Sequence, residues 1–79
     1  MTKLKYRATF ERGMRGELPE VLYIKAANIV AAGRAWGNTL GKQGYHALYC
    51  PSDAILGWGQ FLMICNRGAA ATYRIDGVS

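Results

Sequence analysis

The chain contains few of the residues that build metal centres. Its 79 residues include two cysteines, one histidine and five acidic residues. A structural zinc site needs four cysteine or histidine ligands in most cases, and a catalytic one needs three protein ligands. Cys50, Cys65 and His46 are too few and too widely separated to supply such a set. We therefore expect no metal and no other cofactor.

The same scarcity argues against catalysis. His46 and Cys50 fall on the same side of one expected strand, but four strand residues span about 13 Å. That separation is too large for the hydrogen bond that joins a nucleophile to its base. The carboxylates are scattered, and Gly57 and Gly59 do not belong to a strand–loop–helix phosphate motif. We expect a protein that is not an enzyme.

Long apolar runs are also missing. The longest strongly apolar run covers residues 61–65, far fewer than the ~20 residues of a membrane helix. Residues 1–6 include two lysines with no apolar segment behind them, so we expect no signal peptide. These features predict a cytoplasmic protein without a membrane association, in which both cysteines are reduced and buried.

What the chain has in abundance is apolar and basic residues. It is 51% hydrophobic and 19% charged, a composition typical of a folded protein, and we expect one domain over residues 1–79. Nine aromatic residues exceed what so small an interior holds, so some large side chains should lie on the surface or in an interface. The net charge of +5 favours anionic partners, although solubility alone also explains it.

Hydrophobic patterning predicts strands in both halves of the chain. Residues 4–11 alternate between apolar and polar, and with residues 21–27 they predict a hairpin whose connection is the glycine- and proline-containing segment 12–19. Further strands are expected at 45–50, 61–65 and 70–75, with turns at 51–53 and 66–68 and a frayed end at 76–79. Residues 54–60 read either as a loop or as the start of a strand.

One helix is expected between the two groups of strands. Asn28 is a suitable N-cap, and Gly44 is a suitable stop after a helix that ends near residue 43. The inward face of the helix repeats with helical spacing and consists of Ile29, Ala32, Trp36 and Leu40. The order β-β-α-β-β-β predicts an α+β, two-layer fold in which one helix packs on an antiparallel sheet.

Three glycines, Gly33, Gly37 and Gly41, recur every four residues within this helix. Each costs about 1 kcal/mol relative to alanine, and together they form a strip of bare backbone along one flank. The strip either lets the helix lie close to its own sheet or forms an interface with another chain, such as a homodimer. We favour the first explanation.

A basic surface is expected on the first hairpin. Lys3, Lys5 and Arg7 project from one side of the first strand, and Tyr23 and Lys25 should lie on the same side of its neighbour. Cations mixed with an aromatic residue suit a nucleic acid or an acidic protein. Alternating lysines also protect an edge strand from aggregation, and no RNA-binding signature is present.

The segment that contains Ile55, Leu56 and Trp58 has two interpretations. In a loop, these side chains form an apolar anchor of the kind found at binding hot spots. At the start of a strand, they pack within the fold. The sequence does not separate the two.

Several segments together resemble small phage-encoded proteins. These are residues 5–10 (KYRATF), residues 26–28 (AAN), an alanine-rich helix with an aromatic at Trp36, and the strand at 44–48 (GYHAL). Proteins of this kind include anti-CRISPR proteins and small inhibitors of host RNA polymerase. The resemblance covers residues 4–50 and implies a non-enzymatic protein that occludes a site on a larger host machine. The helix glycines and the apolar second half depart from the pattern, so it specifies no target.

The leading hypothesis is therefore a phage or mobile-element inhibitor of a host nucleoprotein complex, for example a CRISPR effector, acting in the host cytoplasm. The first alternative is a small basic protein that binds nucleic acid through the first two strands. The second alternative is a homodimeric structural protein.

Overall fold

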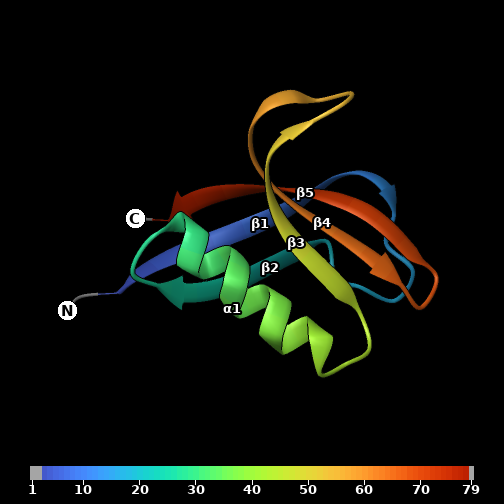
Figure 1. The fold of residues 1–79 in the computed structure, drawn as a ribbon, viewed down its shortest axis with the longest axis horizontal. Coiled ribbons are helices and arrows are strands. Elements are labelled where there is room, and N and C mark those ends of the chain that lie inside the picture. Colours follow the sequence, from blue (N-terminus) through green and yellow to red (C-terminus); the bar gives the residue numbers. More distant parts are fainter. Residues whose placement is uncertain (1–2, 79) are drawn as a thin grey trace.

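A computed structural model describes residues 3–78 and contains one helix packed on one antiparallel sheet (Figure 1). The α+β, two-layer class and the order of elements are confirmed. In chain order the elements are β1 (Leu4–Met14), β2 (Val21–Ala26), α1 (Ile29–Gly41), β3 (His46–Asp53), β4 (Gly57–Asn66) and β5 (Ala69–Val78).

The sheet has the spatial order β2-β1-β5-β4-β3, and every neighbouring pair is antiparallel. β2 and β3 are therefore the two edge strands. The helix lies across one face of the sheet and contacts both edge strands, most extensively β3 (Figure 1). We call the opposite face the open face.

The helix begins and packs as its sequence predicts. The Asn28 side chain accepts a hydrogen bond from the Ala31 backbone N–H at 2.9 Å, and Trp36 at the centre of the inward face is only 3% exposed. The last helical residue is Gly41, two residues earlier than expected. A turn through Gly44, whose φ of 91° suits glycine, then leads into β3.

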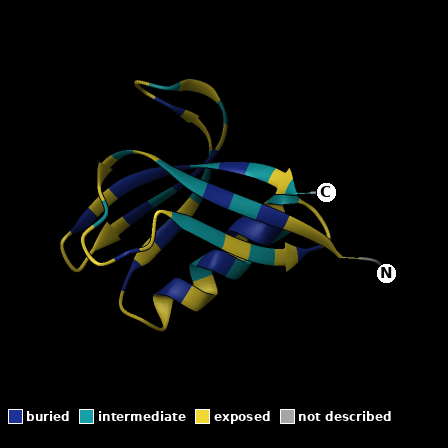
Figure 2. Ribbon diagram, turned by 180° about the vertical axis from the view of Figure 1, so that it is seen from behind, coloured by how far each residue is buried: buried dark blue, intermediate teal, exposed yellow. Residues whose placement is uncertain are grey.

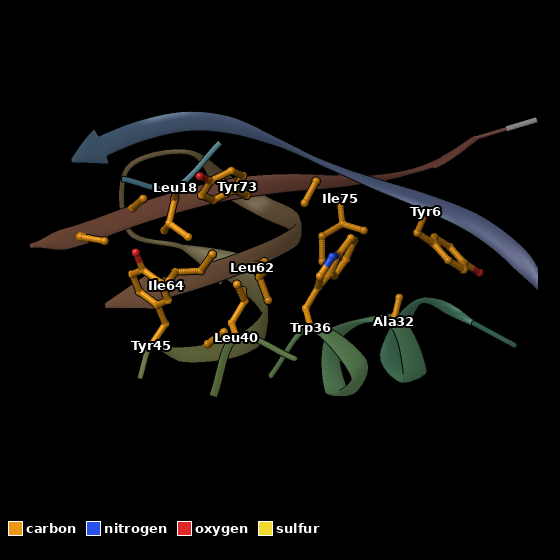
Figure 3. Close-up of a cluster of buried hydrophobic side chains, with 14 of the residues drawn as sticks. Tyr6, Leu18, Ala32, Trp36, Leu40, Tyr45, Leu62, Ile64, Tyr73 and Ile75 are labelled. Carbon is orange, nitrogen blue, oxygen red and sulfur yellow. The ribbon is translucent and has the colours of Figure 1, made fainter. Parts of the chain in front are cut away.

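The core lies between α1 and the sheet (Figure 3). Trp36 points toward Ile75 of β5, and Leu40 lies beside Leu62 of β4. Side chains from every strand join this cluster, so the two halves of the chain share one hydrophobic core.

Two strands are longer than their sequences predict. A bulge between Phe10 and Arg12 lets β1 continue to Met14, so the connection to β2 is limited to residues 15–20. At the other end, β5 runs to Val78 and pairs with the start of β1. The expected frayed end is therefore wrong for residues 76–78, because β1 supplies a partner strand; Ser79 lies outside the described residues.

The β3–β4 hairpin also extends beyond its expected limits. The predicted turn at 51–53 is wrong, because β3 continues through Pro51 to Asp53, and proline is tolerated in an edge strand beside a bulge. The turn lies instead at residues 54–56, and residues 57–60 belong to β4. We call residues 51–60 the hairpin arm; it projects from the rest of the molecule (Figures 1 and 2).

The expected burial of the cysteines is wrong. Cys50 is half-buried and Cys65 is exposed, and both thiols are free. The reason is that both alternate onto the open face, whereas Leu62 and Ile64 of the same apolar run point into the core. Among residues 3–78, no helix combines the length and apolar character that crossing a membrane requires.

Candidate binding surface

The basic residues predicted on the first hairpin do come together on the open face. Lys5 lies directly opposite Lys25 in the β1–β2 pair, and Arg7 lies directly opposite Tyr23. The alternation of the strands sends Tyr6, Ala8 and their partners to the helix side instead. We call Lys3, Lys5, Arg7, Tyr23 and Lys25 the basic cluster, with Lys3 exposed immediately before β1.

The Lys5–Lys25 pair is electrostatically unfavourable by itself. Directly opposite residues of an antiparallel pair have Cβ atoms about 4.5–5.5 Å apart, and like charges there are destabilising. The Lys5 Nζ lies 4.8 Å from the centre of the Tyr23 ring, a cation–π contact that holds one ammonium group beside an exposed aromatic. The pair concentrates positive charge at a site open to solvent.

Arg7 is less available than the lysines. Its guanidinium lies 3.7 Å from the Asp76 carboxylate on β5, which partly compensates the charge. Nearby, Arg74 pairs with Glu11 at 3.1 Å. Within residues 3–78, the salt bridges include none of Lys3, Lys5 or Lys25.

The hairpin arm presents a second, apolar surface. Ile55 and Trp58 are 73% and 85% exposed, and Leu56 is half-buried. Trp58 belongs to β4 and pairs with Ser52, so this part of the segment is a strand that nevertheless leaves its aromatic side chain in solvent. The loop interpretation therefore holds for residues 54–56 and the strand interpretation for residues 57–60, although the Trp58 side chain lies in solvent instead of packing within the fold.

A buried carboxylate that the sequence analysis missed fixes the base of this arm. The Asp53 side chain accepts hydrogen bonds from the Arg12 guanidinium (2.8 and 3.2 Å) and from the Thr72 hydroxyl (3.3 Å). It also accepts bonds from the backbone N–H groups of Ile55 and Leu56, at 2.8 and 2.9 Å. The Arg12 hydrogen bonds, followed by those backbone bonds, hold the pKa of Asp53 well below its usual value.

Only part of this arrangement had a sequence signal. An aspartate just before a turn commonly accepts bonds from the next backbone N–H groups, and Asp53 stands in that position. Its partner Arg12 is 41 residues away. The bulge in β1 turns Arg12 onto the open face opposite Thr72, and no local pattern predicts that bulge.

The glycine strip faces the protein's own sheet at two of its three positions. A Cβ added to Gly33 would lie 2.5 Å from the Tyr49 Cβ, and one added to Gly37 would lie 3.2 Å from the Ala47 carbonyl oxygen. A Cβ at Gly41 would meet nothing within 4 Å. The bare backbone lets α1 lie close to β3, as we favoured.

The structure brings one pair of the candidate catalytic and metal residues together. His46 and Cys50 share the open face of β3 with Leu48 between them, and Cys65 of β4 lies directly opposite His46. Within residues 3–78, no three histidine, cysteine or acidic side chains cluster as metal ligands.

Comparisons with protein-family models, with curated proteins and with solved structures found no match to this chain.

Proposed function

We propose that the protein is a non-enzymatic binding protein that occupies a site on a larger nucleoprotein complex and thereby inhibits it. The observation that carries this proposal is the positive charge of Lys5 and Lys25, which oppose each other and form no salt bridge with a carboxylate of residues 3–78. An anionic partner would relieve their repulsion on binding.

The hairpin arm supplies the apolar part of the proposed contact. Exposed tryptophan is strongly enriched among the residues that contribute most to binding free energy. Trp58 stands on an arm whose base is held by the Asp53–Arg12 pair, and this restraint lowers the conformational entropy that the arm's backbone loses on binding. Charge then orients the protein, and Trp58 anchors it.

The geometry favours an acidic protein surface over a nucleic acid as the immediate contact. Stacking of bases on aromatic rings supplies much of the affinity for single strands, but the Lys5 ammonium group covers one side of Tyr23, the sole aromatic residue in the basic cluster. Arg7, a natural phosphate ligand, is already paired with Asp76. The resemblance to anti-CRISPR proteins is the reason for proposing inhibition of a phage host's complex.

The test compares two charge reversals that lower the net charge equally. Lys25→Glu changes the basic cluster, and Lys42→Glu changes an exposed residue just after α1. Tagged proteins are used to capture partners from host lysate, and each recovered partner is titrated against both variants. We expect Lys25→Glu to weaken binding roughly tenfold and Lys42→Glu to leave it unchanged; equal effects would contradict the proposal.

Two further measurements separate the alternatives. Salt-dependent retardation of single- or double-stranded nucleic acid in a mobility-shift titration, lost in Lys25→Glu, would favour the nucleic-acid binder. A dimer mass by light scattering that persists in Lys25→Glu would favour the homodimeric protein.

A further inference from the structure

Residues 46–50 at the β3 edge of the sheet lack the sequence features that usually prevent strand addition. Edge strands are commonly protected by lysines, prolines, bulges or short length. β2 is six residues long and carries Lys25. By contrast, residues 46–50 of β3 contain no lysine, arginine or proline, and Pro51 and the bulge follow only after them.

A groove follows this unprotected edge. It has a volume of about 580 Å³ and lies between β3 and the glycine-bearing flank of α1. Its strand side consists of residues 45–49. Consecutive strand residues point to opposite faces, so a groove that contacts all five residues runs along the edge of the sheet.

The helix forms the other wall of the groove. Gly37 lies close to the Ala47 carbonyl and sets the near limit, whereas a side chain at Gly41 would find open space. Val30, Arg34 and Asn38 complete the helical wall and are all exposed. The groove therefore has room for an extended chain beside β3.

The charge around the groove is positive. Arg34 lies in its wall, and the Arg67 guanidinium stacks 5.5 Å from the ring centre of Tyr45, at the other end. The groove is lined by no carboxylate of the described chain. Asp53, Asp76 and Glu11 are held in salt bridges with cations of β1 and β5, and Glu17 and Glu20 lie in the β1–β2 connection.

We propose that this groove binds an extended acidic segment of a partner protein, which adds to β3 as a sixth strand. Main-chain hydrogen bonds to residues 46–50, a stretch of about 17 Å, supply the affinity. Arg34 and Arg67 select acidic side chains. The charge argues against a second copy of this chain as the occupant, because two molecules of net charge +5 repel each other.

The first test uses a decapeptide of alternating valine and glutamate, titrated into isotope-labelled protein at low salt. We expect saturable amide shifts at residues 45–49 and along 33–41. The alternating valine–lysine peptide should bind at least tenfold more weakly. A valine–glutamate peptide N-methylated at every residue should not bind, because it has no backbone N–H donor for the strand. No saturation at millimolar peptide, or equal binding of all three peptides, would overturn the proposal.

Variants of the groove form the second test. Gly41→Leu should fill the open space and weaken peptide binding at least tenfold, whereas Gly41→Ala should bind the peptide as the wild type does. Far-UV circular dichroism checks that both variants fold. Arg34→Glu should weaken binding, and Lys42→Glu is its matched control. If both Gly41→Leu and Arg34→Glu bind the peptide as tightly as the wild type, the proposal that the peptide binds in the groove is refuted.

The same titration separates this proposal from the basic cluster. If Lys25→Glu abolishes peptide binding while Gly41→Leu does not, the peptide binds the open face and the groove proposal fails. If the amide shifts at residues 45–49 depend on protein concentration without peptide, the occupant of the groove is a second copy of this chain, and the proposal of an acidic segment is overturned.

Discussion

Replacing Gly33 by alanine should destabilise the fold, whereas the same replacement at Gly41 should stabilise it slightly. Both positions are helical, so both gain from the higher helix propensity of alanine, by up to about 1 kcal/mol. Only at Gly33 does the new methyl group meet an obstacle, the Tyr49 Cβ at 2.5 Å. That distance is far inside van der Waals contact, and a Cβ cannot rotate away.

The size of the effect follows from these two contributions. Forcing an extra methyl group into a packed contact costs about 1–3 kcal/mol, so Gly33→Ala should lose up to about 2 kcal/mol after a propensity gain of about 1 kcal/mol is subtracted. For a domain of this size a loss of about 2 kcal/mol corresponds to a fall in Tm of about 8–16 °C. Gly37→Ala should change the free energy of unfolding by close to zero, because the 3.2 Å contact with the Ala47 carbonyl oxygen requires only a small shift.

Urea denaturation followed by circular dichroism measures these differences, with light scattering to confirm an unchanged mass. The difference between the free energies of unfolding of Gly33→Ala and Gly41→Ala is largely free of the helix-propensity contribution and leaves the steric one. If Gly33→Ala proves as stable as Gly41→Ala, the close approach of α1 to β3 is not the reason for the glycines. If Gly37→Ala keeps its stability but loses association, the strip is an interface.

Three other predictions concern the arm, the core and the surface. Arg12 holds the pKa of Asp53 below its unfolded value, so the ionised Asp53 side chain stabilises the fold fully at neutral pH, and this stabilisation should be lost as pH falls below about 4. In urea denaturation at a series of pH values, Asp53→Asn should remove the fall of the midpoint over this acidic range. Tyr73→Phe removes the 2.6 Å hydrogen bond to the Pro19 carbonyl and should cost about 0.5–1.5 kcal/mol in the same denaturation assay; an unchanged midpoint would mean that water replaces the bond fully. Trp58→Ala should change stability by less than about 0.5 kcal/mol but weaken partner binding, and an equal loss of both would contradict the anchor role.

The parts of the fold that were predicted correctly have local causes. Asn28 caps the helix through its own backbone neighbours, and Trp36 is central because a helix places residues four apart on one face. The alternation in β1 and β2 likewise placed Lys5, Tyr23 and Lys25 on a common face before their register was known. Short-range geometry is sufficient for such predictions.

The parts that were missed depend on partners distant in the chain. Residues 76–78 form a strand only because the beginning of β1 pairs with them. Cys65 is exposed because it lies on the face of β4 opposite the helix, away from the core that Leu62 and Ile64 join. Asp53 is buried only because a bulge far away in the sequence turns Arg12 toward it.

The sequence by itself determined the number of elements, their order and the alternation of side chains along β1 and β2, since these follow from backbone periodicity. Only the tertiary structure decided that β3 is an edge, that α1 lies beside it along Gly33 and Gly37, and that a groove remains between them. The physical reason is that strand order and close packing arise from contacts between residues far apart in the chain. No local periodicity records such contacts.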